Sequence, residues 1–229
     1  MDEIVEKTFE RLYDRNAGCS VLDAIYKNCS FESCVFSMTN ESKKRSMARN
    51  LIFKNCSVRS CTIHSAIIED VIVDGLKTSG LLQMWGPLLR HVVLKGKIGR
   101  VMISRAISLG TAPAAVQHQF DLTHQSYYKG SDWALDISEG HFEEMELQGI
   151  PTRLIRRDPQ TQVVIRRSKV LSGGWQNINL TGTHWATSLD FLAHREDEDA
   201  VLVAGKAHKN FTRLKEGLDL LVETGIAER

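Results

Sequence analysis

Basic side chains are concentrated in one short segment, residues 152–170, of this 229-residue chain. Six cations against the single acid Asp158 give the segment a local charge of +5 (six minus one). The cations are Arg153, Arg156, Arg157, Arg166, Arg167 and Lys169. Because guanidinium groups bind phosphate and carboxylate bidentately, the segment favours an anionic ligand. Two alternatives are an edge strand guarded by charge and pairing with the acidic residues Glu139, Glu143, Glu144 and Glu146.

Residues 104–134 hold a second group of side chains that could form a binding site. They are His118, His124, Tyr127, Tyr128 and Trp133. We expect a long loop here, and a loop on a rigid scaffold is a common place for binding residues. The alternative is a surface loop that packs on its own aromatic side chains. The two histidines are a weak match to a metal-binding pair.

Enzyme motifs are absent from the sequence, which contains no G-x-S-x-G, H-E-x-x-H or G-x-G-x-x-G. The carboxylates Glu143, Glu144 and Glu146, near the arginines, are the candidates for acid/base work. An enzyme with a groove near residues 104–134 is therefore one alternative, lined by His118, His124 or this glutamate group. The sequence assigns no catalytic residue, metal or cofactor, and favours a non-enzymatic protein.

A five-residue repeat over residues 19–76 is the element that must position these groups. The large apolar positions are Val21, Tyr26, Phe31 and Phe36, then Phe53, Val58, Ile63, Ile68 and Val73. The positions two residues earlier are Cys19, Ala24, Cys29 and Cys34, then Leu51, Cys56, Cys61, Ala66, Val71 and Leu76. A period of five fits neither a helix nor a plain strand. It predicts a chain that turns a corner every five residues and stacks its coils about 4.8 Å apart.

The two blocks of the repeat are out of phase by two residues, which predicts an insertion at residues 40–45. The same frame returns more weakly at 88–103 and again over 133–150. We expect degenerate coils in the first of these segments and a further coil in the second.

This five-residue repeat, which we call the ladder, resembles the pentapeptide-repeat proteins over Cys19–Phe36 and Leu51–Leu76. It departs from that family by lacking leucine at most large positions and by being interrupted. The resemblance implies a right-handed β-helix of square cross-section with four repeats per coil. Some members of the family bind DNA gyrase by mimicking the charge of DNA, which needs a strongly acidic face. The cations Lys54, Arg59 and Lys77 on this ladder disfavour that role.

All five cysteines fall on the smaller ladder position: Cys19, Cys29, Cys34, Cys56 and Cys61. Free cysteine behaves as a small hydrophobic residue and is often buried. The spacing Cys29-x4-Cys34 could also suggest zinc, but zinc ligands come with further Cys or His residues at other spacings. The ladder therefore favours core packing over metal binding.

The expected architecture is mainly β: a right-handed, pentapeptide-like β-helix with an N-terminal capping helix and a C-terminal α/β extension. Residues 1–16 are expected to form an amphipathic helix that caps the solenoid, or alternatively a dimerisation helix. Coils follow over 17–103, the inserted loop over 104–134, and a further coil with a basic hairpin over 135–170. A helical region covers 171–229, with helices near 183–193 and 211–223.

The whole chain carries a net charge of only +1 and has no signal peptide or long apolar run. These features predict a soluble cytoplasmic protein without a membrane partner. The leading hypothesis is a protein-interaction module or scaffold on a rigid β-helix. Binding of nucleic acid or a phosphate ligand through residues 152–170 is the second hypothesis, and a homodimer through a solenoid end is a further alternative.

Overall fold

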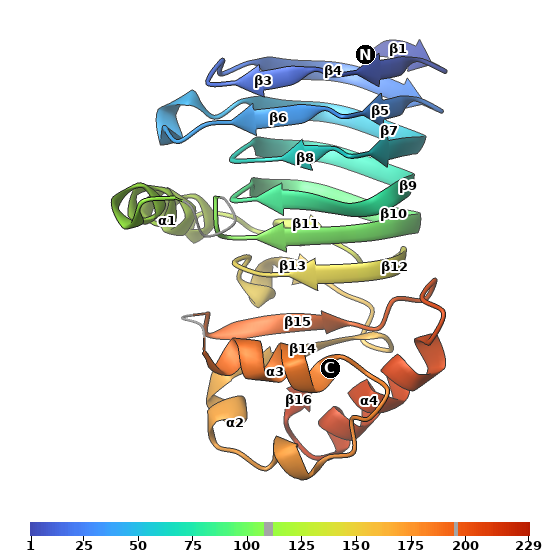
Figure 1. The fold of residues 1–229 in the computed structure, drawn as a ribbon, viewed down its shortest axis with the longest axis vertical. Helices are drawn as coiled ribbons and strands as arrows, with labels where there is room; N and C mark the ends of the chain where they lie inside the picture. Colours follow the sequence, from blue (N-terminus) through green and yellow to red (C-terminus); the bar gives the residue numbers. More distant parts are fainter. Residues whose placement is uncertain (108–111, 195–196) are drawn as a thin grey trace.

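The computed structural model describes residues 1–107, 112–194 and 197–229, and the fold is mainly β (Figure 1). Residues 108–111 of the predicted loop and 195–196 of the predicted helical region lie outside the described residues. The strands form one open sheet path that runs from β1 at one end to β16 at the other. Figure 1 shows the strands as successive layers along the long axis of the molecule.

Thirteen of the described strands form a parallel stack, which we define as residues 2–107 and 112–156. The first two layers contain β1 (Asp2–Val5), β2 (Thr8–Glu10) and β3 (Tyr13–Arg15), then β4 (Ser20–Lys27), β5 (Ser30–Glu32) and β6 (Val35–Met38). The following strands are β7 (Met47–Arg59), β8 (Thr62–Ile63), β9 (Ile67–Trp85), β10 (Leu88–Ser104), β11 (Leu135–Asp136), β12 (Gly140–Leu147) and β13 (Ile155–Arg156). Every pairing among them is parallel.

Corners recur at five-residue intervals within the stack. Residues with left-handed backbone φ include Asp23, Asn28 and Ser33 in one layer, and Asn50, Asn55 and Ser60 in the next. Asn, Asp and Ser tolerate this conformation better than other side chains. The polar residues between the apolar ladder positions therefore include the residues that turn the chain.

The predicted insertion is confirmed between β6 and β7, where the 3₁₀ helix η1 (Ser42–Lys44) lies. Phe31 pairs with Val58 of the next layer, and Val58 pairs in turn with Thr78 of the layer after that. The separation along the chain from Phe31 to Val58 exceeds the separation from Val58 to Thr78 by one five-residue repeat plus two residues. This explains the two-residue phase shift between the blocks of the ladder.

The ladder positions line the larger of two hydrophobic cores. Leu51, Ala66 and Val71 are buried, while Phe53 and Val73 are half-buried and pack against them. Aromatic rings stack between layers, with centroids 4.9 Å apart for Tyr26 and Phe53 and 5.0 Å apart for Phe9 and Phe31. The weaker frames also belong to the stack, because β12 pairs with β10.

The cysteines are free thiols that follow the ladder in four cases. Cys29 and Cys56 are buried, and Cys34 and Cys61 are half-buried. Cys19 is exposed, so its predicted inward position is wrong. It lies directly after the left-handed Gly18 at the start of a layer, before β4 begins.

The substitution Cys56→Ala should leave the protein folded and lower the free energy of unfolding by about 1 kcal/mol, because a small buried side chain loses one sulfur. Chemical denaturation monitored by circular dichroism measures this change. Elemental analysis should find no stoichiometric zinc in either protein. Zinc that is bound by the wild type and lost in the variant would contradict the packing role.

The predicted capping helix over 1–16 is wrong, because these residues form β1, β2 and β3. Val5, Phe9 and Leu12 have helical spacing, but Ile4 and Phe9 also keep the five-residue step. The third member of that series is Asp14, a polar residue that interrupts the apolar pattern in the sequence. Its carboxylate accepts a hydrogen bond from the backbone N–H of Ser37 at 2.9 Å.

Most of the predicted loop at 104–134 is helix α1 (Ala114–Lys129), so that prediction is also wrong. The helix begins directly after Pro113. Phe120, His124 and Tyr128 are its buried side chains, at four-residue spacing. In Figure 1, α1 projects to one side of the stack.

The basic hairpin predicted over 152–170 does not form. The 3₁₀ helix η2 (Thr152–Leu154) precedes β13, which pairs with β11 in parallel. Strand β14 (Gln162–Arg166) pairs antiparallel with β15 (Asp199–Val203) and β16 (Ala227–Glu228) instead. The expected turn at Asp158 does exist, since the N–H of Thr161 donates to its carbonyl at 3.2 Å. The strands on either side of that turn have other partners.

A second hydrophobic core organises the C-terminal unit, which we define as residues 162–194 and 197–229. Helices α2 (Arg167–Leu171), α3 (Trp185–Ala193) and α4 (Phe211–Glu223), with the 3₁₀ helix η3 (Trp175–Asn177), accompany the antiparallel strands. The predictions of helices near 183–193 and 211–223 are confirmed. Trp185 is buried and its indole N–H donates to the carbonyl of Leu214 at 2.9 Å.

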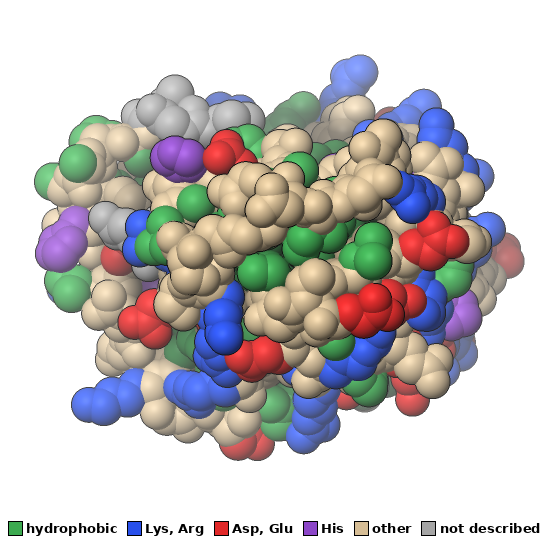
Figure 2. Space-filling model, turned by 90° about the horizontal axis from the view of Figure 1, so that it is seen from below, with side chains coloured by type: hydrophobic (Ala, Val, Ile, Leu, Met, Phe, Trp, Pro, Cys, Tyr) green, Lys and Arg blue, Asp and Glu red, His purple; other side chains and the backbone are tan. Residues whose placement is uncertain are grey.

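The C-terminal unit closes one end of the parallel stack. Leu202 of β15 pairs antiparallel with Glu146 of β12, and the N–H of Ala207 donates to the carbonyl of Phe142 at 2.9 Å. Figure 2 shows this end of the molecule, where acidic and basic side chains are interspersed with small hydrophobic groups. No helix in the described ranges has the length and apolar content needed to cross a membrane.

Candidate functional site

The carboxylate of Glu69, on β9, accepts four hydrogen bonds from three side chains. Arg49 of β7 and Arg90 of β10 lie in register with it on either side. Arg49 Nη2 is 2.5 Å from Glu69 Oε2, and Arg90 Nη2 is 2.6 Å from Oε1. The Glu69 side chain is only 4 % exposed, whereas those of Arg49 and Arg90 are 45 % and 41 % exposed. Two guanidinium groups therefore face solvent over one buried acid.

Helix α1 covers this carboxylate with Tyr127, whose hydroxyl donates to Glu69 Oε1 at 2.8 Å. The guanidinium carbon of Arg90 also lies 5.6 Å from the centre of the Tyr127 ring. Burial alone would raise the pKa of Glu69, but the Tyr127 hydroxyl and the two arginines outweigh it and lower that pKa. The carboxylate is therefore ionised and holds α1 against the sheet.

An adjacent polar group surrounds His91, a corner residue that directly follows Arg90. Its Nδ1 is 3.0 Å from Asp70 Oδ1, and its Nε2 is 2.8 Å from Asp132 Oδ1. The hydrogen bond with Asp132 is the main cause that raises the pKa of His91, with Asp70 adding to it against partial burial. Both ring nitrogens face carboxylates, which favours the doubly protonated imidazolium.

Trp133 links His91 to the basic segment. Its ring centre lies 4.7 Å from that of His91, and the guanidinium carbon of Arg156 lies 4.1 Å from the Trp133 ring centre. The short distance to Arg156 is typical of a cation–π contact. Arg153 donates from Nη2 to the carbonyl of Tyr128 at 3.1 Å. The structure therefore brings together residues from the two segments that the sequence singled out separately.

We name this surface the arginine–aromatic face. Its members are Arg49, Arg90, His91, Trp133, Arg153 and Arg156, with Glu69 and Tyr127 beneath them. It lies where α1, three strands of the stack and the segment around β13 meet. Its cations present guanidinium groups beside an aromatic ring, an arrangement suited to carboxylates on an acidic partner.

The remaining arginines of the predicted basic hairpin serve the fold. Arg157 donates to the carbonyl of Gln162 at 3.1 Å, and Arg167 donates to that of Ala193 at 3.1 Å. Arg166 forms an ion pair with Glu228 of β16, with Nε 3.1 Å from Oε1. Only Arg153 and Arg156 of the five predicted arginines therefore belong to the arginine–aromatic face.

The other predicted residues of 104–134 do not join this face. His118 is exposed on α1, whereas His124 is buried and its Nε2–H donates to the carbonyl of Pro87 at 3.0 Å. The Tyr128 hydroxyl is also buried and accepts a hydrogen bond from the N–H of Leu89 at 3.0 Å. His124 and Tyr128 therefore attach α1 to the start of β10 and act as structural residues.

Arg45, in the insertion before β7, is a structural residue that the sequence did not reveal. It is 7 % exposed, and its Nη1 donates to the carbonyls of Ser65 at 2.7 Å and Gly86 at 2.8 Å. Its guanidinium carbon lies 4.6 Å from the ring centre of Phe120 on α1. Burial lowers the pKa of Arg45 to about 10, so the side chain stays charged at neutral pH. The insertion thus fastens both the stack and the helix.

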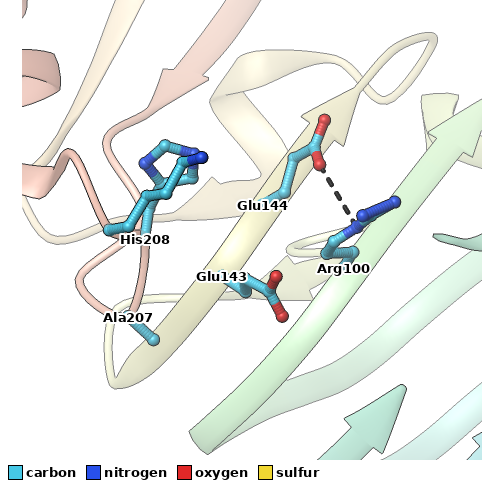
Figure 3. Close-up of a pocket in the computed structure, with 6 residues that line it drawn as sticks. Arg100, Glu143, Glu144, Ala207 and His208 are labelled. Atoms are coloured by element: carbon cyan, nitrogen blue, oxygen red, sulfur yellow. Dashed lines mark ion pairs between the residues drawn. The ribbon is translucent and has the colours of Figure 1, made fainter. Parts of the chain in front are cut away.

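A pocket of about 440 Å³ lies where β12 meets the loop that precedes α4 (Figure 3). Arg100, Glu143, Glu144, Ala207, His208 and Lys209 line it. Arg100 Nε is 3.5 Å from Glu144 Oε2. Two of the three glutamates of the alternative enzyme hypothesis, Glu143 and Glu144, therefore line this pocket. Glu146, His118 and His124 are not among its lining residues. The lining contains no serine, threonine or cysteine that could act as a nucleophile.

Comparison with known proteins gives no relative for this chain. No family model matches it, and no curated protein or solved structure does so either. Among residues 1–107, 112–194 and 197–229, no group of three or more His, Cys, Asp or Glu side chains is placed to hold a metal ion.

Proposed function

We propose that this protein is a non-enzymatic, cytoplasmic protein-binding scaffold that holds an acidic partner on its arginine–aromatic face. The observation that carries the proposal is the Arg156–Trp133–His91 contact series beside Arg49 and Arg90. It displays cations on a surface that is fastened from beneath by a buried carboxylate. A pre-organised surface of this kind loses little side-chain freedom when it binds.

We further propose that the parallel stack is a right-handed β-helix of the pentapeptide type. The spacing of its corners supports this, because left-handed residues recur every five positions in successive layers. Register supports it too, since Ala48 pairs with Ile68 and Leu51 with Val71. Each of these pairings joins positions four five-residue steps apart, and four is the number of repeats in a square coil.

Contacts at the face favour recognition of carboxylates on a protein over neutral ligands. Arg49 and Arg90 share one acid between them, so the two cations exceed their buried counter-charge. Arg156 is exposed and stacks on Trp133, which leaves the edge of its guanidinium group for a ligand. Aromatic and arginine residues are also the types most enriched in interface hot spots.

The nucleic-acid hypothesis has less support, because four of its five arginines are engaged within the fold. Arg153, Arg157 and Arg167 donate to backbone carbonyls, and Arg166 pairs with Glu228. A phosphate backbone needs a longer track of free cations than Arg156 provides.

The proposal is tested by measuring which proteins and nucleic acids bind the wild type and a charge-reversed variant. Arg153→Glu/Arg156→Glu alters the face without touching the ion pairs of Glu69. Lys169→Glu/Lys209→Glu applies the same charge change to the C-terminal unit and is the matched control. Each protein is immobilised at equal density and its captured partners are quantified by mass spectrometry.

We expect an acidic protein that binds the wild type and the control, and binds the face variant at least about tenfold more weakly. Its affinity should fall as salt screens the charges. Equal capture by all three proteins would contradict the proposal. Tight binding of DNA or RNA at low salt, lost in the face variant, would favour the nucleic-acid hypothesis instead.

A further inference from the structure

The guanidinium group of Arg45 has one edge that no group of the described residues satisfies. Its Nη1 donates to the carbonyls of Ser65 and Gly86, and the ring of Phe120 lies against the group. Its Nε and Nη2 are buried and have no hydrogen-bond partner within the described ranges. The N–H bonds along this edge of a guanidinium group form a rigid fork that can hold one anion bidentately. The free edge of Arg45 therefore has the form of an anion-binding group.

Ser65, which contacts Arg45, has a third unpartnered polar atom. It is fully buried, and its hydroxyl oxygen has no hydrogen-bond partner among the described residues. The other described residues with buried, unpartnered side-chain atoms are only half-buried: Asp14, Arg100, Arg167 and Trp175. The two fully buried residues of this kind in the described chain are therefore in direct contact with each other. Because buried polar groups without partners are rare, two of them in contact indicate a ligand.

The charge of Arg45 also lacks a counter-charge in the described part of the chain. Its hydrogen bonds there reach only neutral carbonyls, although the side chain stays protonated at neutral pH. The acid of the insertion, Glu41, pairs with Lys44 at 2.8 Å. The acid of α1, Asp121, pairs with Arg105 at 3.3 Å. A buried cation is costly unless an opposite charge accompanies it, so the site favours an anion.

We propose that Arg45 and Ser65 bind one small monovalent anion of the halide class inside the protein. Nε and Nη2 of Arg45 donate to the anion side by side, and the hydroxyl of Ser65 is the third donor. A monovalent anion neutralises the single charge of the guanidinium group, whereas a divalent anion leaves a net charge buried. Water alone would satisfy the donors but would not neutralise the charge. This inference is independent of the arginine–aromatic face and of the partner proposed for it.

Chloride is the probe that tests the proposal, in comparison with gluconate, an anion too large for a buried site of this kind. Thermal unfolding followed by circular dichroism is measured in the two sodium salts at equal ionic strength. Equilibrium dialysis with radioactive chloride then counts the ions bound per chain.

Two variants remove different parts of the site. Arg45→Gln removes the charge and the fork, whereas Ser65→Ala removes the third donor and keeps the guanidinium group. Arg157→Gln is the matched control, because Arg157 is another half-buried arginine that donates to a carbonyl and has no ion pair among the described residues. If Arg45→Gln fails to fold, Ser65→Ala and the dialysis of the wild type still decide the question.

We expect the wild type and the control to bind one chloride per chain. A site with a dissociation constant of about 1 mM should raise their unfolding midpoints by about 5 °C between about 1 and about 100 mM chloride. Ser65→Ala should bind chloride at least about tenfold more weakly, because one hydrogen-bond donor is lost. Folded Arg45→Gln should bind none.

Two results would overturn the proposal. The first is equal midpoints for the wild type in the two salts with no chloride bound, which would assign the free edge of Arg45 to buried water. The second is chloride binding that Ser65→Ala or folded Arg45→Gln leaves unchanged, because the anion would then lie elsewhere.

Discussion

Replacing Glu69 by glutamine should lower the free energy of unfolding by about 3 kcal/mol, because the carboxylate is a buried, charged acceptor of several hydrogen bonds. It accepts them from Arg49, Arg90 and Tyr127 while almost fully buried. Hydrogen bonds to a charged group contribute about 1.5–3 kcal/mol each, but those from the half-exposed arginines lie at or below the low end. Glutamine has the same shape as glutamate, but its amide N–H₂ group takes the place of one carboxylate oxygen. That group cannot accept the hydrogen bond that the oxygen accepted.

Urea unfolding of the two proteins, followed by circular dichroism, measures this difference. Glu143→Gln on β12 is the matched control, because that side chain is exposed and its loss should change stability by less than about 0.5 kcal/mol. Equal midpoints for Glu69→Gln and the wild type would mean that the buried carboxylate does not hold α1 to the stack. Tyr127→Phe should lower the free energy of unfolding by less than Glu69→Gln does, because it removes only one hydrogen-bond donor.

Acidification should destabilise the protein through His124, by about 3 kcal/mol between about pH 6.5 and pH 4. Burial is the main cause that lowers the pKa of His124 to about 4, and the nearby Arg45 charge adds to it. The unfolded chain has the ordinary histidine pKa near 6.5 and so binds more protons than the native state in this range. The stabilisation is therefore complete above the unfolded pKa and disappears as pH falls through the native pKa.

The substitution His124→Phe tests this linkage by keeping a ring of similar size that does not titrate. Its stability should depend less on pH across that range than the stability of the wild type, even if its stability at neutral pH is lower. His64 and His184, whose pKa values burial also lowers, remain in both proteins and contribute equally. Leu122→Ala, at an exposed position of the same helix that does not titrate, should keep the wild-type dependence on pH. Parallel pH profiles for His124→Phe and the wild type would contradict the assignment.

The five-residue ladder could be predicted from the sequence because local side-chain size fixes it. Leu51, Ala66 and Val71 lie in the core that the period assigns to them. The insertion before β7 could be predicted as well, since it shifts the phase of that period. The first layer could not, because Asp14 occupies a position where the repeat requires an apolar residue.

The candidate site could be predicted only in its parts. The sequence marks Trp133 and Arg156 as candidate binding residues, but they belong to different segments and only the tertiary fold stacks one on the other. Glu69 reads as an outward polar residue, because the sequence does not show that α1 covers it. The partners of β14 could not be predicted either. Its turn at Asp158 suggests a local hairpin, whereas its partner β15 follows only after α2, η3 and α3.

The arginine in the insertion has a consequence for how the molecule opens. Most layers of the stack contact only the layers on either side, so fraying should advance inward from an uncovered end. Arg45 joins the carbonyls of Ser65 and Gly86, which precede two different later strands, and also rests on Phe120 of α1. These contacts couple the layers into one cooperative unit. We expect the amide hydrogens of the strands before Arg45, β1 to β6, to exchange before those of the rest of the stack. These layers should therefore open at a lower free energy than the layers that Arg45 joins.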